Sequence, residues 1–260
     1  MRKIGLVGGM SWHSTLGYYR ILNEEVAAAR GGHASARVSL ESLDFAEIRE
    51  CQQTGDWPRA ARLVTESALR CQASGAEAVV ICTNLMHRVA DDVEAALDVP
   101  LLHIADAIAE AAHAQGWSQV GVLGTSWVAA EDFYVGRLAR NGLRVHVPTA
   151  EEQGEVDRVI FDELTLGRIE EPSRAAYAGV IERLAEAGAE AVVLACTEVG
   201  LLVRPEDSAL PVLDSAEVHA QTAAAWALGP AVGDSPPSPV RLTPAPPAGS
   251  GRPGPWGRRR

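Results

Sequence analysis

The chain has 260 residues, of which 47% are hydrophobic and 22% are charged, and its formal net charge is −11. An acidic protein is a poor partner for nucleic acids, because phosphate binding needs Lys and Arg to displace counterions. No apolar run reaches the roughly 18 residues that cross a bilayer, and the N-terminal segment lacks the cleavage pattern of a signal peptide. We therefore expect a cytoplasmic protein that binds neither membranes nor nucleic acids and keeps its four cysteines reduced.

In chain order, short apolar runs alternate with stretches whose apolar residues recur at helical spacing. We predict the first half as strand 3–9, helix 11–29, strand 36–45, helix 58–73, strand 75–82 and helix 84–97. The second half is predicted as strand 119–127, helix 134–141, helix 173–187, strand 188–196 and a final segment 211–228. Strand–helix alternation of this kind is typical of parallel sheets with crossover helices, so the predicted fold class is α/β.

The two halves repeat one another. GAEAVV begins at Gly75 and again at Gly188, a Cys-Thr pair follows each copy, and QVGVLGTSW at 119–127 resembles KIGLVGGMSW at 3–12. We therefore predict two pseudo-symmetric lobes, each a mainly parallel sheet flanked by helices, with the active site between them. The predicted division is a first lobe at 1–105 completed by 208–229, a second lobe at 106–207, and a disordered Pro/Gly/Arg-rich tail at 230–260.

Cys82 and Cys196 stand at matching points of this repeat, each at the end of an apolar strand. Ligands of open α/β sheets bind beyond the carboxyl ends of the strands, so two facing lobes would bring both thiols to one cleft. Inverting a stereocentre by proton transfer requires two acid–base groups on opposite sides of one carbon, and the pKa of a thiol suits that role. Cys51 and Cys71 are predicted to be core residues.

Four segments together resemble the aspartate/glutamate racemase family, most closely its broad-specificity amino-acid racemase branch. They are GLVGGMSWHSTLGYYRILNE at 5–24, CTNLMH at 82–87, LLHIADA at 101–107 and CTEVGLL at 196–202. The resemblance implies a homodimeric amino-acid racemase or epimerase that needs neither pyridoxal phosphate nor another cofactor nor a metal. It also implies that Cys82 and Cys196 are the two catalytic bases. The residues that it places around the amino-acid substrate are Met10, Ser11, Gln52, Thr83, Asn84, Leu85, Thr125, Thr197 and Glu198.

Two departures from the family pattern bear on the substrate. The family usually reads CTNTMH, and Leu85 replaces the second threonine here, which favours a more apolar pocket or an altered substrate. Aspartate-specific relatives hold the side-chain carboxylate with an arginine and a lysine. Ile48 and Thr165 align with those positions, although Arg49 and Arg168 lie close by. We therefore expect a neutral or mixed substrate range rather than strict aspartate specificity.

Other interpretations stay open. Hydantoin racemases, maleate-type isomerases and decarboxylases use the same scaffold, although two cysteines disfavour a decarboxylase, and a small-molecule binding protein with silent thiols is a third possibility. Glu198 stands where the glutamate racemase branch has a histidine, which favours the aspartate and broad-specificity side. His87 is a poor metal-ligand partner for Cys82, because residues five apart do not share a helix face. If both cysteines act on one substrate, one should rest as a thiolate and the other as a thiol.

Overall fold

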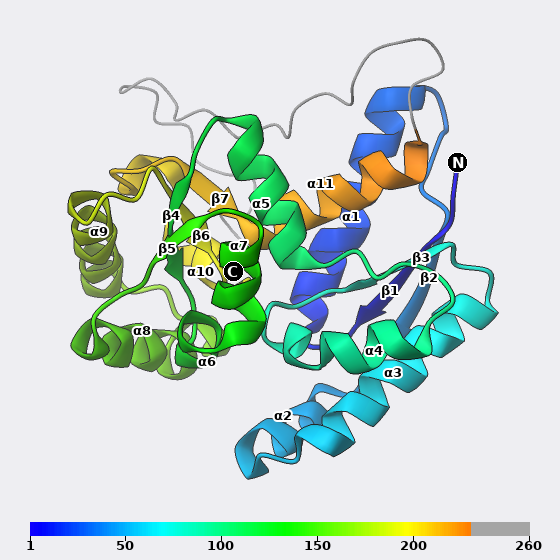
Figure 1. The fold of residues 1–260 in the computed structure, drawn as a ribbon, viewed down its shortest axis with the longest axis horizontal. Helices are drawn as coiled ribbons and strands as arrows, with labels where there is room; N and C mark the ends of the chain where they lie inside the picture. The colour runs from blue at the N-terminus through cyan, green and yellow to red at the C-terminus, as the bar shows by residue number, and fades with distance from the viewer. Residues whose placement is uncertain (230–260) are drawn as a thin grey trace, which may run out of the picture.

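The computed structural model describes residues 1–229, and the predicted tail at 230–260 lies outside the described residues. Two lobes are visible, each built on its own parallel sheet (Figure 1). In the first lobe β1 lies between β2 and β3, and a single parallel bridge from Val79 to Leu101 extends the sheet beyond β3. The strands of this sheet are β1 Ile4–Gly8, β2 Val38–Ser42 and β3 Ala78–Ile81.

The second sheet repeats this order and adds one regular strand. β4 lies between β5 and β6, and β7 pairs with the far side of β6, all in parallel. The strands are β4 Gln119–Leu123, β5 Arg144–His146, β6 Ala191–Leu194 and β7 Val212–Asp214. β7 thus takes the place that Leu101 takes in the first sheet. The predicted architecture of two similar α/β lobes is confirmed.

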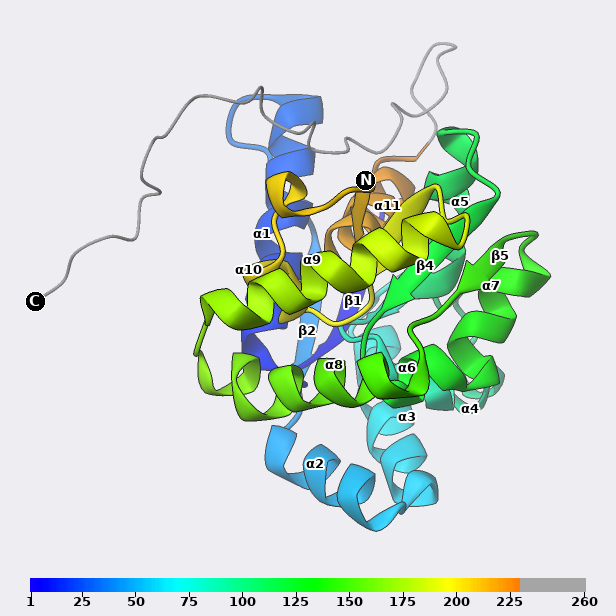
Figure 2. The same ribbon diagram turned by 90° about the vertical axis from the view of Figure 1, so that its left-hand side faces the viewer.

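Helices cover both sheets (Figures 1 and 2). Those that precede the first crossing between the lobes are α1 Trp12–Arg30, α2 Phe45–Thr54, α3 Trp57–Ala73, the 3₁₀ helix η1 Leu85–Val89 and α4 Ala90–Ala96. Those that follow it are α5 Ile104–Ala114, α6 Ser126–Ala130, the π-helix η2 Asp132–Gly136, α7 Arg137–Arg140, α8 Ala150–Asp162, η3 Leu164–Leu166, α9 Glu171–Glu186, α10 Val199–Leu202, η4 Pro205–Asp207 and α11 Ser215–Leu228. The sequence pattern predicts one helix where η1 and α4 lie, and it does not predict α2, α5 or α8.

Both sheets are buried on both faces. Along β1, Ile4 and Leu6 belong to a core shared with α1 and α11, whereas Val7 belongs to a core shared with α2, α3 and α4. Along β4, Val122 packs with α5 and α7, whereas Leu123 packs with α8 and α9. Successive strand residues point to opposite faces, so a strand between two helical layers must be apolar throughout. This requirement explains the continuous apolar runs in the sequence.

The repeated GAEAVV segments make the same contacts in both lobes. Gly75 and Gly188 follow α3 and α9 with φ angles of 87° and 103°, a region that glycine enters without steric cost. Glu77 Oε1 accepts a hydrogen bond from the backbone just before β1 at 3.0 Å, and Glu190 Oε2 accepts one from the start of β4 at 2.8 Å. The repeat therefore fastens each helix end to its central strand and fixes where the next strand, with its cysteine, ends.

The chain crosses between the lobes twice. After Leu101 it enters α5, which packs in the core of the second lobe, and after β7 it enters α11, which packs against α1 of the first lobe (Figure 1). Residues 208–229 thus divide at Asp214. β7 hydrogen-bonds to β6 in the second sheet, contrary to the expected return of the whole segment to the first lobe, because its parallel register continues that of β4 and β6.

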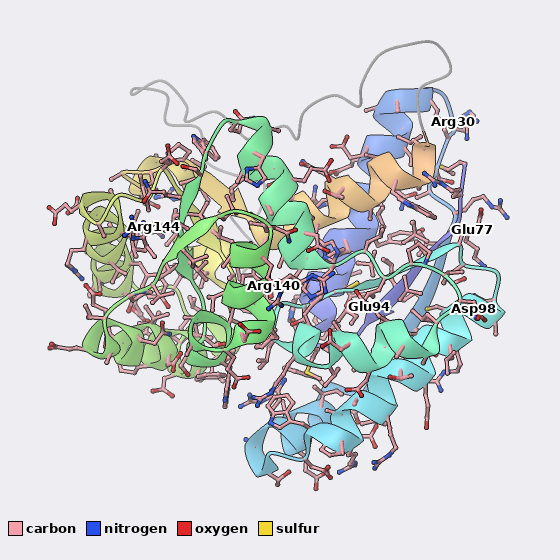
Figure 3. All side chains as sticks on the ribbon, in the orientation of Figure 1. Arg30, Glu77, Glu94, Asp98, Arg140 and Arg144 are labelled. Atoms are coloured by element: carbon pink, nitrogen blue, oxygen red, sulfur yellow. The ribbon has the colours of Figure 1, made fainter. Side chains whose placement is uncertain are left out.

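Charged side chains project from the outside of both lobes, as Arg30, Glu77 and Arg144 show in Figure 3. The ion pair between Arg88 Nη1 and Glu131 Oε1, at 2.6 Å, joins the first lobe to the second. In the stretch that the structure describes, no helix combines the length and the apolar character that a membrane span needs.

Candidate active site

Cys82 follows β3 at the carboxyl end of the first sheet. Its backbone N–H donates to Val7 O at 2.9 Å, and its carbonyl accepts a hydrogen bond from Ser14 Oγ at 3.0 Å. The first turn of α1, which carries Ser14, comes this close because Gly8 has no side chain: a Cβ there would lie 2.5 Å from Thr15 Cγ2. Cys82 is only 1% exposed.

Cys196 holds the matching place after β6 and is partly buried. Its Sγ lies 3.4 Å from Glu198 Oε2, and Thr197 Oγ1 donates to the same oxygen at 2.7 Å. The other carboxylate oxygen, Oε1, accepts a hydrogen bond from Ser11 Oγ of the first lobe at 3.3 Å. Glu198 therefore connects the thiol of Cys196 to the residue that precedes α1.

A second connection joins the two cysteine loops. Asn84 Nδ2 donates to Ser215 Oγ at 2.9 Å, and Ser215 Oγ donates to Leu194 O at 2.7 Å. Leu194 is the last residue of β6, so the loop after Cys82 is two hydrogen bonds away from the strand that leads to Cys196. The carboxyl ends of the two sheets meet here, which is the kind of place where α/β proteins bind ligands.

Among the buried polar atoms that have no hydrogen-bond partner within residues 1–229, two belong to predicted substrate residues at this junction: Asn84 Oδ1 and Thr125 Oγ1. Thr125 follows β4 beside the Cys196 loop, since a Cβ on Gly124 would lie 2.8 Å from Ala195 O. Leaving such an atom unpaired costs about 1–3 kcal/mol, which a polar ligand can offset.

Burial raises the pKa of both thiols. Desolvation is the main cause for Cys82, and for Cys196 desolvation comes first and the negative charge of Glu198 adds to it. The direction of both shifts favours the neutral thiol over the thiolate at each cysteine in this arrangement. Either sulfur needs a proton acceptor before it can act as a base, and Glu198 is the carboxylate in contact with Cys196.

Comparison with known proteins gives this geometry a context. The Asp/Glu/Hydantoin racemase family matches residues 7–223, which include both cysteines. The chain belongs to this family. A Yersinia pestis protein whose assignment as an Asp/Glu racemase is provisional has a similar structure, with a TM-score of 0.84 and 46% identity over 88% of this chain and 100% of that one.

Two further solved structures are also similar to this racemase-family protein. An aspartate racemase homologue from Pyrococcus horikoshii is 32% identical, with a TM-score of 0.74, over 85% of this chain and 97% of that one. The aspartate racemase of Picrophilus torridus shares the fold at 18% identity, with a TM-score of 0.65, over 85% of this chain and 91% of that one.

In this member of the racemase family, most of the predicted substrate residues lie in the loops at the junction. Thr83, Asn84, Thr197 and Glu198 lie in the loops that follow the two cysteines. Ser11 contacts one of these loops through Glu198, and Thr125 lies beside the Cys196 loop. Their polar groups come from both lobes, and the contact between the lobes brings them together.

The other three predicted substrate residues make contacts within the protein. Met10 is 4% exposed and packs in the core of the first lobe. Leu85 packs against the core of the second lobe, so the residue that replaces the usual threonine contributes to the contact between the lobes. Gln52 donates to Met86 Sδ at 3.5 Å and accepts from Arg49 Nη1 at 2.9 Å.

Sequence reasoning missed three residues that hold the cysteine loops. Ser14 binds the carbonyl of Cys82, Ser215 binds the side chain of Asn84, and His87 Nδ1 lies 2.8 Å from Thr83 O. Ser14 and His87 fall inside the family-like segments, and from the sequence His87 is considered only as a partner of Cys82 in a metal site. Ser215 looks like an ordinary helix start, because Asp214 caps α11.

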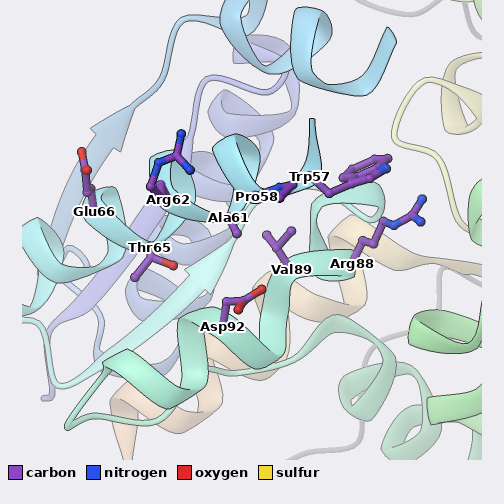
Figure 4. A pocket seen from close by; sticks show the side chains of 9 residues that line it. All are labelled: Trp57, Pro58, Ala61, Arg62, Thr65, Glu66, Arg88, Val89 and Asp92. Carbon is purple, nitrogen blue, oxygen red and sulfur yellow. The ribbon is translucent and has the colours of Figure 1, made fainter. Parts of the chain in front are cut away.

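A pocket of about 660 Å³ lies elsewhere, between α3 and the η1–α4 segment (Figure 4). The guanidinium carbon of Arg88 lies 4.0 Å from the centre of the Trp57 ring, and the same side chain pairs with Glu131. No cysteine lines this pocket. Among the described residues, no three His, Cys, Asp or Glu side chains converge as a metal site. We therefore place the candidate active site at the cysteine junction.

Proposed function

We propose that the protein is a cofactor-independent racemase or epimerase of amino acids, in which Cys82 and Cys196 exchange protons with Cα from opposite faces. The observation that carries this proposal is the junction itself. Ser215 and Glu198 hydrogen-bond across the lobes and so hold the two cysteine loops, one from each lobe, at one place. Membership of a racemase family supports the same chemistry.

The proton balance of the proposed reaction is symmetric. One cysteine, as thiolate, removes the Cα proton, and the thiol of the other gives its proton to the opposite face of the carbanion. After turnover the first sulfur is protonated and the second is not, so the reverse reaction exchanges their roles. Glu198 suits the initiation of this cycle, because its carboxylate is placed to accept the proton of Cys196 at 3.4 Å.

The unpaired buried atoms suit an amino acid as substrate. Asn84 Oδ1 is an acceptor, which an ammonium group satisfies, and the hydroxyl of Thr125 is a donor for a carboxylate. Donors that are already in place when charge develops on the carbanion lower the barrier, each by about 3 kcal/mol. Both groups of the substrate are attached to the carbon that reacts, so these contacts would also orient Cα between the sulfurs.

Substrate entry requires the lobes to separate, because Cys82 is almost completely buried in this structure. Closure then excludes water from the carbanion and strengthens the electrostatic contacts around it. The interlobe contacts that must break include the polar ones of Glu198 with Ser11 and of Arg88 with Glu131, and the apolar packing of Leu85.

The side-chain specificity depends on the residues that align with the carboxylate-binding positions of aspartate-specific relatives. Ile48 is fully buried in the core and Thr165 bonds to Phe161 O of its own segment, so neither supplies a charge for a substrate carboxylate. Arg49 extends from α2 towards the second lobe, where its guanidinium carbon lies 5.2 Å from the centre of the Phe161 ring. We propose a mixed range, with Leu85 favouring neutral amino acids and Arg49 admitting acidic ones.

We also propose a homodimer. α1 exposes Trp12, Leu16 and Tyr19 at a spacing that places them on one face of the helix. An exposed apolar stripe of this kind suits a self-association surface. Sedimentation equilibrium should then give twice the mass of the 27.5 kDa chain.

Hydrogen–deuterium exchange at Cα tests the proposed function. L-amino acids are incubated with the protein in deuterium oxide, and the products are analysed by proton NMR and chiral chromatography. We expect solvent deuterium at Cα together with the D-enantiomer, and we expect Cys82→Ala and Cys196→Ala to abolish net racemisation while Cys51→Ala, a change in the core, retains it. Absence of exchange with every amino acid, or racemisation by either active-site variant at the wild-type rate, would contradict the proposal.

A further inference from the structure

Three buried histidines lie where the chain crosses between the lobes. His103 precedes α5 at the first crossing, and His219 lies on α11 after the second. His87 lies in η1, five residues after Cys82 in the chain. The ring centroid of His87 is 4.4 Å from that of His103 and 5.6 Å from that of His219. The cluster therefore connects both crossings to the loop of one candidate catalytic cysteine.

The hydrogen bonds of His87 fix its protonation. The backbone N–H of Ile104 donates to Nε2 at 3.2 Å, so Nε2 carries no proton. Nδ1 lies 2.8 Å from Thr83 O, which only accepts, so Nδ1 must carry the hydrogen. His87 is thus a neutral ring that links the residue after Cys82 to the first residue of α5.

His219 supports this arrangement from the other crossing. Its Nε2 lies 2.7 Å from Leu102 O and must donate to it, and its Nδ1 then accepts from Tyr18 OH at 2.8 Å. Leu102 directly precedes the crossing that His103 begins. α1, α11 and the segment that leads into α5 are therefore held together by hydrogen bonds whose direction is determined.

Each residue of the Cys82–Asn84 loop is fastened to a different element. The carbonyl of Cys82 is bound by Ser14 of α1, the carbonyl of Thr83 by His87, and the side chain of Asn84 by Ser215 of α11. Of these contacts, the one through His87 connects the loop to the start of α5, whose packing lies in the second lobe.

We propose that His87 is a positioning residue for Cys82, which holds the cysteine loop in a fixed relation to the first crossing between the lobes. This inference rests on the proposed role of Cys82 as a catalytic base. The Nδ1–H bond to Thr83 O sets the path of the backbone at the cysteine, and the bond from Ile104 to Nε2 sets its position relative to α5. His87 acts through the backbone of Thr83 and does not touch the substrate.

A matched pair of substitutions separates the two bonds of His87. The amide of His87→Asn lies where Nδ1 lies and can still donate to Thr83 O, whereas the amide of His87→Gln reaches the Nε2 position and retains only the bond to Ile104. The rates at which iodoacetamide alkylates Cys82 and Cys196 are measured by peptide mass spectrometry, with Cys196 as the internal control.

We expect His87→Gln to change the alkylation rate of Cys82 by at least about tenfold, and to lower kcat more than it changes KM. His87→Asn should stay within about threefold of the wild type, and the rate of Cys196 should change in neither variant. Equal effects of the two substitutions, or equal changes at both cysteines, would show a general structural role and overturn the inference.

A measurement on the unsubstituted protein keeps the inference testable if the Gln variant does not fold. Nitrogen-15 NMR of the histidines should show His87 as the neutral Nδ1–H tautomer between pH 6 and 8, and the opposite tautomer would contradict the proposed link to Thr83. Alkylation and NMR need no turnover. If these results hold while the deuterium screen finds no exchange, the proposed function fails and the linkage of His87 to the Cys82 loop stands.

Discussion

In the proposed mechanism, Glu198 is the residue on which the chemistry depends most, apart from the cysteines. One carboxylate oxygen contacts Cys196 Sγ and Thr197 Oγ1, and the other contacts Ser11 of the opposite lobe. The same negative charge that would accept the proton of Cys196 also raises the pKa of that thiol. The Glu198 carboxylate would thus favour deprotonation of Cys196 by accepting its proton, and it opposes deprotonation through its negative charge.

Replacement of Glu198 by glutamine separates these two effects. Glutamine can keep the hydrogen bonds but cannot take a proton, so kcat should fall on the order of 10²-fold. Loss of the negative charge lowers the pKa of Cys196, so iodoacetamide should alkylate this cysteine faster than in the wild type at the same pH. Glu182→Gln, on the exposed face of α9, is the control. A variant with wild-type kcat, or with slower alkylation of Cys196, would remove Glu198 from the mechanism.

At the scale of elements, the repeated turn before β3 and β6 sets the position of each cysteine. Gly75 and Gly188 both have positive φ, and the glutamate two residues later anchors the central strand of each sheet. A Cβ on Gly75 would meet no atom within 4 Å, so the requirement for glycine there comes from the backbone alone.

Alanine at either turn should therefore cost stability in similar amounts. We expect Gly75→Ala and Gly188→Ala each to lower the free energy of unfolding by about 1–2 kcal/mol, measured by urea denaturation. Gly154→Ala is the matched control, because this glycine lies inside α8 with open space around it and should gain up to about 1 kcal/mol. Unchanged stability at both turns would contradict this account of the repeat.

The elements that the sequence predicts well are those with a local signal. The continuous apolar runs that end at Cys82 and Cys196 indicate buried parallel strands, and the repeat indicates two lobes. The helix predicted at 84–97 fits the spacing of Leu85 and Val89, but it is divided, because His87 turns inward to bond to Thr83 and Ile104.

The candidate site was less accessible to prediction, because its supports join residues far apart in the chain. Asn84 and Ser215 are 131 positions apart, and Ser11 and Glu198 are 187 positions apart. No spacing rule connects such pairs. Asn84 and Glu198, which the family resemblance names, lie at this junction, and Met10, which it also names, packs in the core of the first lobe.

For the whole molecule, the buried histidines make stability depend on pH. Burial lowers the pKa of His219 to about 4, lowers that of His103 to about 2, and holds that of His87 well below its ordinary value. In the unfolded chain each would titrate near 6.5, so the unfolded state binds more protons below that pH. The contribution that the neutral, buried histidines make to the free energy of unfolding is complete above about pH 6.5. It is lost as the pH falls towards the pKa values that the histidines have in the folded state.

We expect the free energy of unfolding to fall by about 1 kcal/mol per buried histidine between pH 7 and pH 5.5. The glutamine of His219→Gln does not titrate, so this variant should lose about 1 kcal/mol less stability than the wild type over the same pH range. Asp214 and Glu217 have raised pKa values, which make stability rise as the pH falls. Both are present in the wild type and in the variant, so the comparison isolates the effect of His219. Urea denaturation at the two pH values measures the difference. An identical pH dependence in wild type and variant would show that folding does not lower the pKa of His219.

The central claim is that both sulfurs face one bound substrate, and protection against alkylation tests it most directly. The amino acid found by deuterium exchange is titrated into the protein, and the rates at which iodoacetamide labels Cys82 and Cys196 are followed separately. We predict that both rates fall with the same half-saturating concentration, because one molecule covers both thiols. Protection of only one cysteine, or protection of the two at different concentrations, would contradict a shared site.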